Sequence, residues 1–129
     1  MWKRSGNNKE AIINKDGAQY MMLKNLNPFS LDELGIDGVA YKKEEALLIV
    51  QHLLEEVIPI LGGDVYYLIE GKPCYTTYAG WSCDMVAGET FSDYVKRSCE
   101  EAKKYIESFP AEGKSIPLFN IVEMAVGKI

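Results

Sequence analysis

Apolar side chains recur at three- and four-residue steps along residues 91–109, and this pattern constrains the fold more than any other feature of the chain. The stripe consists of Phe91, Tyr94, Val95, Cys99, Ala102, Tyr105, Ile106 and Phe109. Such spacing over about five turns is typical of an amphipathic helix with one buried face. Thr90 is the expected N-cap, and Pro110 is expected to end the helix. Asp93 and Arg97 are four residues apart and are expected to pair on its outer face.

A second amphipathic helix is predicted over residues 43–57, where apolar residues recur with the same spacing. In its last turn, Glu55 and Glu56 oppose the helix dipole, so they are candidates for a role other than stability. His52, the single histidine, falls on the polar face and is expected to be solvated. Upstream, a capping box over residues 30–33 predicts a short helical turn.

Several segments have the apolar, β-branched character of strands. They lie at residues 58–61, 65–69, 74–78, 81–86 and 117–124. Gly62 and Gly63 interrupt the first two segments, which indicates a β-bulge or a close approach of two backbones. Alternation places Trp81, Cys83 and Met85 on one face and Ser82 and Asp84 on the other. The order of helix, strands, helix and strand predicts an α+β fold, in which two long amphipathic helices pack on one side of a mainly antiparallel sheet of about four to five strands.

The length and composition favour a single soluble domain. The chain has 129 residues, of which 47% are apolar, so residues 1–129 are expected to share one core, with residues 1–10 loose. No apolar run reaches the roughly 18 residues of a membrane span, and the start lacks the apolar stretch of a signal peptide, which predicts a cytoplasmic protein. The three cysteines are expected to be reduced, and their spacing predicts neither a metal site nor a cofactor.

Negative charge is concentrated after the first 43 residues. The formal net charge is −5, and residues 44–71 hold six carboxylates without one Lys or Arg. These are Glu44, Glu45, Glu55, Glu56, Asp64 and Glu70. Such a surface repels phosphate backbones, so direct binding of nucleic acid is not expected, whereas a basic protein would be attracted. Acidic surfaces also serve solubility alone, and that alternative stays open.

Two further function classes stay open on the sequence. Asp64, Asp84 and Glu89 fall at strand ends or in loops, where carboxylates that converge would suit a hydrolase. Residues 66–81 also contain five aromatic residues, namely four tyrosines and Trp81. Tyr and Trp are favoured at protein interfaces, and the same cluster would suit a pocket for a small ligand.

Several short motifs occur in an order that resembles a known family. They are Ser30-Leu31-Asp32-Glu33-Leu34-Gly35-Ile36, Glu44-Glu45-Ala46-Leu47, Ile60-Leu61-Gly62-Gly63-Asp64-Val65-Tyr66, Trp81, Glu89, Tyr94-Val95-Lys96-Arg97-Ser98, Ala102, Tyr105-Ile106 and Phe119-Asn120-Ile121-Val122. Together they resemble the immunity-protein family numbered forty of bacterial polymorphic toxin systems, over about residues 30–123. The resemblance implies a cytoplasmic antidote that binds a secreted toxin domain, often a nuclease, and blocks it without catalysis. No catalytic residue comes with it.

The candidate partner-binding residues combine the acidic and the aromatic signals. They are Asp64, Tyr66, Trp81, Asp84 and Glu89. Carboxylates and aromatic side chains at these positions are expected to occupy the phosphate-binding positions of a basic nuclease. Gly62 and Gly63 are expected to shape the backbone beside them.

Overall fold

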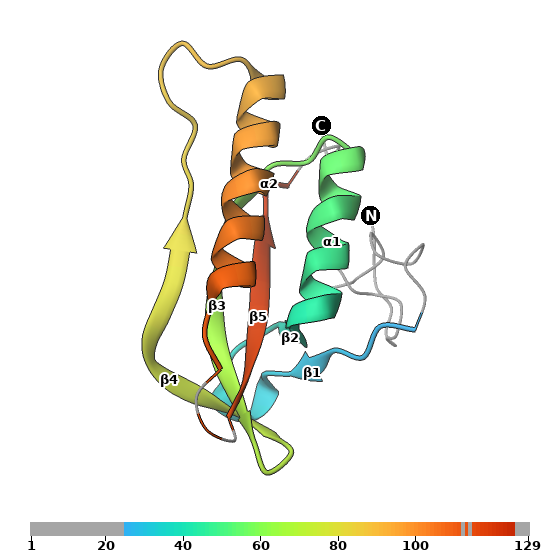
Figure 1. The fold of residues 1–129 in the computed structure, drawn as a ribbon, viewed down its shortest axis with the longest axis vertical. Coiled ribbons are helices and arrows are strands. Elements are labelled where there is room, and N and C mark those ends of the chain that lie inside the picture. The colour runs from blue at the N-terminus through green and yellow to red at the C-terminus, as the bar shows by residue number, and fades with distance from the viewer. Residues whose placement is uncertain (1–24, 112, 114, 126–129) are drawn as a thin grey trace.

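The structure is a computed structural model, which describes residues 25–111, 113 and 115–125, with the backbone alone at residues 76–78 (Figure 1). The segment predicted to be loose, residues 1–10, lies outside the described residues. The elements in chain order are β1 (Phe29–Ser30), the 3-10 turn η2 (Asp32–Leu34), β2 (Val39–Lys42), α1 (Lys43–Glu55), β3 (Ile60–Ile69), β4 (Lys72–Ser82), α2 (Phe91–Ser108) and β5 (Ile116–Glu123).

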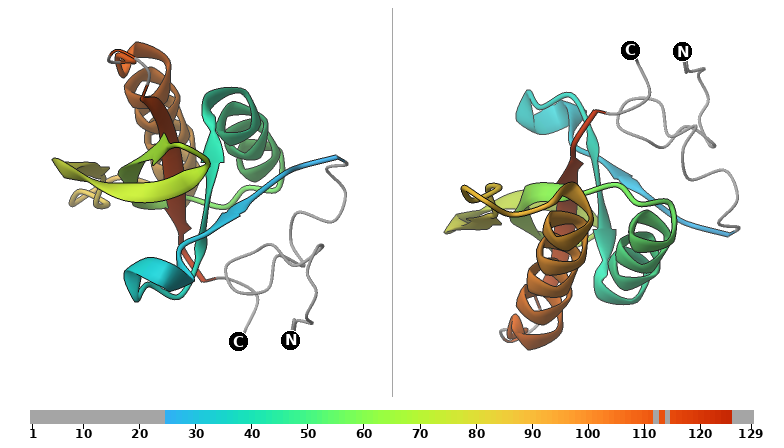
Figure 2. Two further views of the ribbon diagram at one scale, coloured as in Figure 1. Left: turned by 90° about the horizontal axis from the view of Figure 1, so that it is seen from below. Right: turned by 90° about the horizontal axis from the view of Figure 1, so that it is seen from above.

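The strands form one antiparallel sheet in the order β1-β2-β5-β3-β4. Both helices lie on the same face of this sheet, and the η2 turn that follows the edge strand β1 lies on the opposite face (Figure 2). This arrangement confirms the predicted fold class. The short strands β1 and β2 were not predicted, because they are too brief to show a clear alternation.

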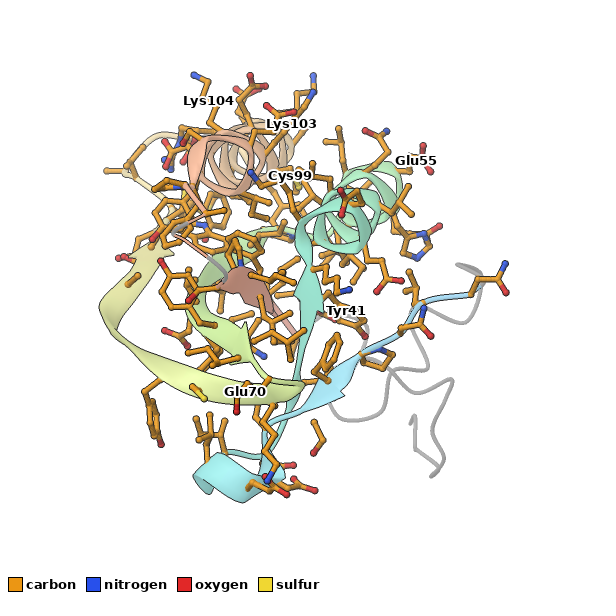
Figure 3. All side chains as sticks on the ribbon, turned by 60° about the horizontal axis from the view of Figure 1, so that its bottom comes forward. Tyr41, Glu55, Glu70, Cys99, Lys103 and Lys104 are labelled. Atoms are coloured by element: carbon orange, nitrogen blue, oxygen red, sulfur yellow. The ribbon has the colours of Figure 1, made fainter. Side chains whose placement is uncertain are left out.

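The helices are amphipathic as their spacing predicts. Thr90 caps α2, since its hydroxyl oxygen accepts a hydrogen bond from the amide of Asp93 at 3.0 Å. Cys99 points from α2 into the core, whereas Lys103 and Lys104 point away from it (Figure 3). The main core fills the space between the helices and the sheet. Its buried members are Tyr41, Ala46, Ile49, Val50, Leu53, Ile58, Ile60, Val65, Val95, Cys99, Ala102, Ile106 and Phe119.

A smaller cluster covers part of the other sheet face. It consists of Leu31, Ala40, Tyr66, Leu68 and Leu118, with Phe29, Leu34 and Ile36 packed against it. The η2 turn and the residues beside it therefore cover part of that face. The rest of the face is left without a covering element among the described residues.

Two local predictions were wrong. The Ser30 hydroxyl accepts from the amide of Asp32 at 3.1 Å and not from Glu33, so the turn is a 3-10 turn without a capping box. His52 is buried in α1, not solvated. The buried arc of this helix is wider than its apolar stripe, and His52 lies at the edge of that arc beside Ile49 and Leu53.

The strands are longer than their patterns predict. Residues 58–61 and 65–69 were expected as two strands, but β3 runs without a break from Ile60 to Ile69, through both glycines. The register against β5 shifts between Ile60 and Gly62, which confirms the predicted bulge. The 81–86 segment ends its pairing at Ser82, as the last part of β4.

The C-terminal end of α1 is strained. The amide of Ile58 donates to the carbonyl of Leu53 at 2.9 Å, and the amide of Val57 donates to that of Leu54 at 3.1 Å. These bonds form a Schellman motif, which places Val57 at the position where glycine is preferred. Val57 has a φ of 61°, an unfavourable conformation for a β-branched residue.

Val57→Gly is therefore expected to raise the free energy of unfolding by about 1 kcal/mol, because glycine adopts the left-handed conformation without strain. Equilibrium unfolding in urea measures the change. Val57→Ala is the matched control, since it removes the exposed methyl groups and keeps Cβ. An equal gain from both variants would contradict the strain explanation.

Candidate functional site

The uncovered part of the sheet presents the exposed carboxylate of Asp64. Val65 packs in the main core, so the alternation of β3 directs Asp64 to the opposite face. Its cross-strand neighbours are Gly80 on β4 and Asn120 on β5. Gly80 has no side chain, and a Cβ placed there would lie 3.1 Å from the Asp64 Oδ1 atom. The Asp64 carboxylate therefore lies next to the backbone of Gly80, with no side chain of that residue beside it.

The next row of the sheet extends this surface. Gly62 pairs with Ser82 on β4 and Val122 on β5, and both of these side chains are exposed. Together, we call the following residues the outer sheet face: Asp64, Gly80, Ser82, Asn120 and Val122. Asp64, Ser82 and Val122 are the exposed members of this surface, whereas Gly80 and Asn120 are half-buried.

Asp84 lies two residues beyond the end of β4, and its side chain is exposed. The Cys83 amide donates to the carbonyl of Leu61 at 2.8 Å, and the Cys83 side chain is buried. Exposed Ser82 and Asp84 alternate with it. Of the five residues predicted from sequence, Asp64 and Asp84 are thus the two with exposed carboxylates.

Tyr66 lies at the covered edge of this face. It is buried in the smaller cluster, and its ring centroid is 6.2 Å from that of Tyr75. Burial is the main cause that raises the pKa of Tyr66, with a further contribution from the charge of Asp64. Tyr75 is mostly exposed, and its hydroxyl donates to the carbonyl of Leu34 at 2.8 Å. Sequence reasoning placed Tyr75 in the aromatic cluster but did not select it as a site residue.

Trp81 faces the helices. Its ring centroid is 4.7 Å from that of Tyr105 on α2. A Cβ placed at Gly63 would lie 2.4 Å from the Trp81 ring and 2.4 Å from the carbonyl oxygen of Asn120. The indole therefore lies over the bare backbone of Gly63, and this contact explains the glycine and the tryptophan together as a packing unit.

Glu89 is held by Arg97. The Arg97 Nε atom donates to Glu89 Oε2 at 2.7 Å, and the Arg97 Nη2 atom donates to Glu89 Oε1 at 2.8 Å. The Glu89 carboxylate also accepts from the amide of Val86 at 3.1 Å. Chiefly because of the Arg97 hydrogen bonds, the pKa of Glu89 falls from its ordinary 4.5 to about 2. The predicted pairing of Arg97 with Asp93 is replaced by this contact and by a longer one to Glu101 at 3.5 Å.

The remaining ionisable groups show no assembled reaction centre in the described part of the chain. All three cysteines are free, and burial raises the pKa of Cys99 to about 11, where the thiolate is scarce at neutral pH. Among the described residues, no group of three or more His, Cys, Asp and Glu side chains could hold a metal ion. Neither described α-helix has the length and apolarity needed to cross a bilayer.

Comparison with known protein families identifies a family model that matches this chain. The family model described as Immunity protein 40 matches residues 30–123, which is well over half of the chain. Searches of the curated proteins and of the solved structures found no match. The matched region begins just before η2 and ends with β5, so it includes both helices, the outer sheet face and the Gly63–Trp81 contact. The chain therefore belongs to the Immunity protein 40 family.

Proposed function

We propose that this protein binds a cognate toxin domain and neutralises it by covering the toxin's functional surface, without catalysing a reaction. Membership of the Immunity protein 40 family is the observation that carries the proposal. The protein acts in the cytoplasm, where an incoming toxin would reach its target. The net charge of −5 favours a basic partner.

The toxin is a basic nuclease, and the outer sheet face with Asp84 is where it binds. A nuclease that grips phosphates carries clustered cations at its active site. Exposed Asp64 and Asp84 provide carboxylates that can take the place of those phosphates. Tyr66, Trp81 and Glu89 contribute by shaping and supporting this surface, because their side chains are engaged inside the protein.

The two alternative functions have no specific observation in their favour. A carboxylate hydrolase needs a buried acid whose pKa is raised, so that it can donate a proton at neutral pH. The pKa of Glu89 is instead lowered, while Asp64 and Asp84 are exposed. A small-ligand module would use the tyrosines and Trp81 as a pocket lining, but Trp81 packs against α2.

Charge reversal tests the proposed surface. Asp64→Lys and Asp84→Lys are each expected to weaken binding of the toxin domain encoded by the neighbouring reading frame by about tenfold, because a cation then faces the basic partner. Isothermal titration at about 0.05 M and about 0.3 M salt measures the effect, which shrinks as salt screens the charges. Glu100→Lys makes the same charge change at an exposed site on α2 and serves as the control. Absence of binding by the unchanged protein would contradict the proposed function, and an equal loss in the control would contradict the proposed surface.

A further inference from the structure

The loop between β4 and α2 concentrates exposed apolar side chains. Residues 83–90 contain neither helix nor strand, and Figure 1 shows the loop arching past the end of β4 to the start of α2. Met85 is 45% exposed and Val86 is 54% exposed, while Phe91, the first residue of α2, is 43% exposed. An apolar group of this kind at the tip of a loop contributes nothing to the core that the described residues form.

The loop is nevertheless tied down along its length. Arg97 donates to the Asp84 carbonyl through Nη2 at 2.7 Å and contacts the Cys83 sulfur through Nη1 at 3.2 Å. The bidentate contact between Arg97 and Glu89 closes the other end of the loop. Two hydrogen bonds of 3.1 Å also join Val86 and Glu89: the Val86 amide donates to the Glu89 carboxylate, and the Glu89 amide donates to the Val86 carbonyl. We call these contacts, together with those of Arg97, the staple.

The start of the loop is fixed from a second direction. The Tyr94 hydroxyl donates to the Cys83 carbonyl at 2.7 Å in a buried hydrogen bond. Arg97 also stacks near the Tyr94 ring, with its guanidinium carbon 5.7 Å from the ring centroid. One arginine and one tyrosine, both on α2, therefore position the loop from Cys83 to Glu89.

A staple of this kind lowers the entropic cost of binding. Apolar side chains that are ordered before binding lose less conformational freedom when a partner covers them. Met is also an adaptable contact residue, because its unbranched thioether side chain fills irregular pockets. Met is moreover among the residues enriched at protein interfaces, which favours Met85 as an anchor.

The charges around the loop indicate the chemistry of its partner. Arg97 is the cation within the loop's own hydrogen-bond network, and Glu89 and Glu101 already neutralise it. Asp84 keeps an exposed carboxylate beside Met85. The surface that fits this loop is therefore apolar at its centre and basic at its rim.

We propose that the β4–α2 loop inserts into the cognate toxin, with Met85 and Val86 in an apolar pocket whose rim carries a Lys or Arg that meets Asp84. This inference rests on the proposed function. It adds an apolar contact with the toxin to the charged contacts of Asp64 and Asp84. The outer sheet face and the loop adjoin at Ser82 and Asp84, so one partner covers both.

The test compares two pairs of equally exposed apolar residues. The double variant Met85→Ser with Val86→Ser is expected to weaken binding of the toxin domain encoded by the neighbouring reading frame at least tenfold. The control double variant combines Leu48→Ser on α1 with Ile69→Ser at the hairpin, whose native side chains are 52% and 43% exposed. It is expected to bind as the unchanged protein does. Titration calorimetry measures affinity, and thermal unfolding checks that both variants are folded.

A third variant tests the staple. Arg97→Lys keeps the charge but cannot make the bidentate contact and the Asp84 contact together, so we expect a several-fold weaker affinity with Met85 and Val86 in place. Unchanged affinity of the Met85/Val86 variant would overturn the inference and leave the proposed function standing. A different result would be that the unchanged protein self-associates, whereas the Met85/Val86 variant does not and still binds the toxin domain. The loop would then join two copies of the chain, and the inference would likewise be overturned. Failure of the unchanged protein to bind would overturn the proposed function itself.

Discussion

Gly63→Ala is expected to lower the free energy of unfolding by about 3 kcal/mol, because the added methyl group meets atoms on both sides. It would lie 2.4 Å from the Asn120 carbonyl oxygen on β5 and 2.4 Å from the Trp81 ring. The Asn120 oxygen belongs to the backbone of a paired strand and cannot move without breaking the sheet register. Equilibrium unfolding in urea measures the loss.

Gly71→Ala is the control for this substitution. Gly71 lies in the β3–β4 hairpin with a φ of 82°, and an added Cβ there meets nothing within 4 Å. Its cost is backbone strain alone, about 1 kcal/mol. Equal losses in the two variants would show that the close approach at Gly63 does not limit stability.

Trp81→Ala is expected to lower the free energy of unfolding by about 3 kcal/mol, since it removes the ring that packs on Tyr105 and covers Gly63. Trp81→Phe is expected to cost less than about 1 kcal/mol. Among the described residues the buried Nε1 atom has no hydrogen-bond partner, so its removal leaves none of their acceptors unsatisfied. Urea unfolding of the two variants measures this difference.

Trp81 also distinguishes packing from direct contact with a toxin. If Trp81 only packs inside the protein, Trp81→Ala reduces stability, and the folded variant keeps its affinity for the toxin domain. A variant with unchanged stability and a large loss of affinity would instead make Trp81 an interface residue. Combining Gly63→Ala with Trp81→Ala should cost less than the sum of the single changes, because the ring that opposes the new methyl group is gone.

The candidate site separates into residues that the sequence can place and residues that it cannot. Asp64 and Asp84 follow from strand alternation and loop position, and both are exposed. Glu89 has the same sequence context as Asp84, but Arg97 reaches it from the next helix and fixes it internally. The exposed apolar side chain of Met85 was not predicted. Strand alternation had grouped Met85 with Trp81 and Cys83, but the strand ends at Ser82.

Both helices could be predicted from the sequence, because their signals are local. The stripe over residues 91–109 and the Thr90 cap predict α2 to within one residue of Phe91–Ser108. Helix α1 begins at residue 43 as predicted and ends two residues early, at the Schellman motif. The order of short motifs likewise led to the family that the comparison matches. The helices and the individual motifs each depend on residues that are close together in the chain.

Tertiary contacts determine which of the candidate residues are exposed and which hold the fold together. They join the two predicted strands into β3, bury His52, and place Trp81 over Gly63. In the folded protein Arg97 pairs with Glu89 and not with Asp93. This ion pair fixes the end of the β4–α2 loop. These outcomes depend on contacts between different elements, where the energy of packing and of a partly buried ion pair exceeds the local preference that spacing can reveal.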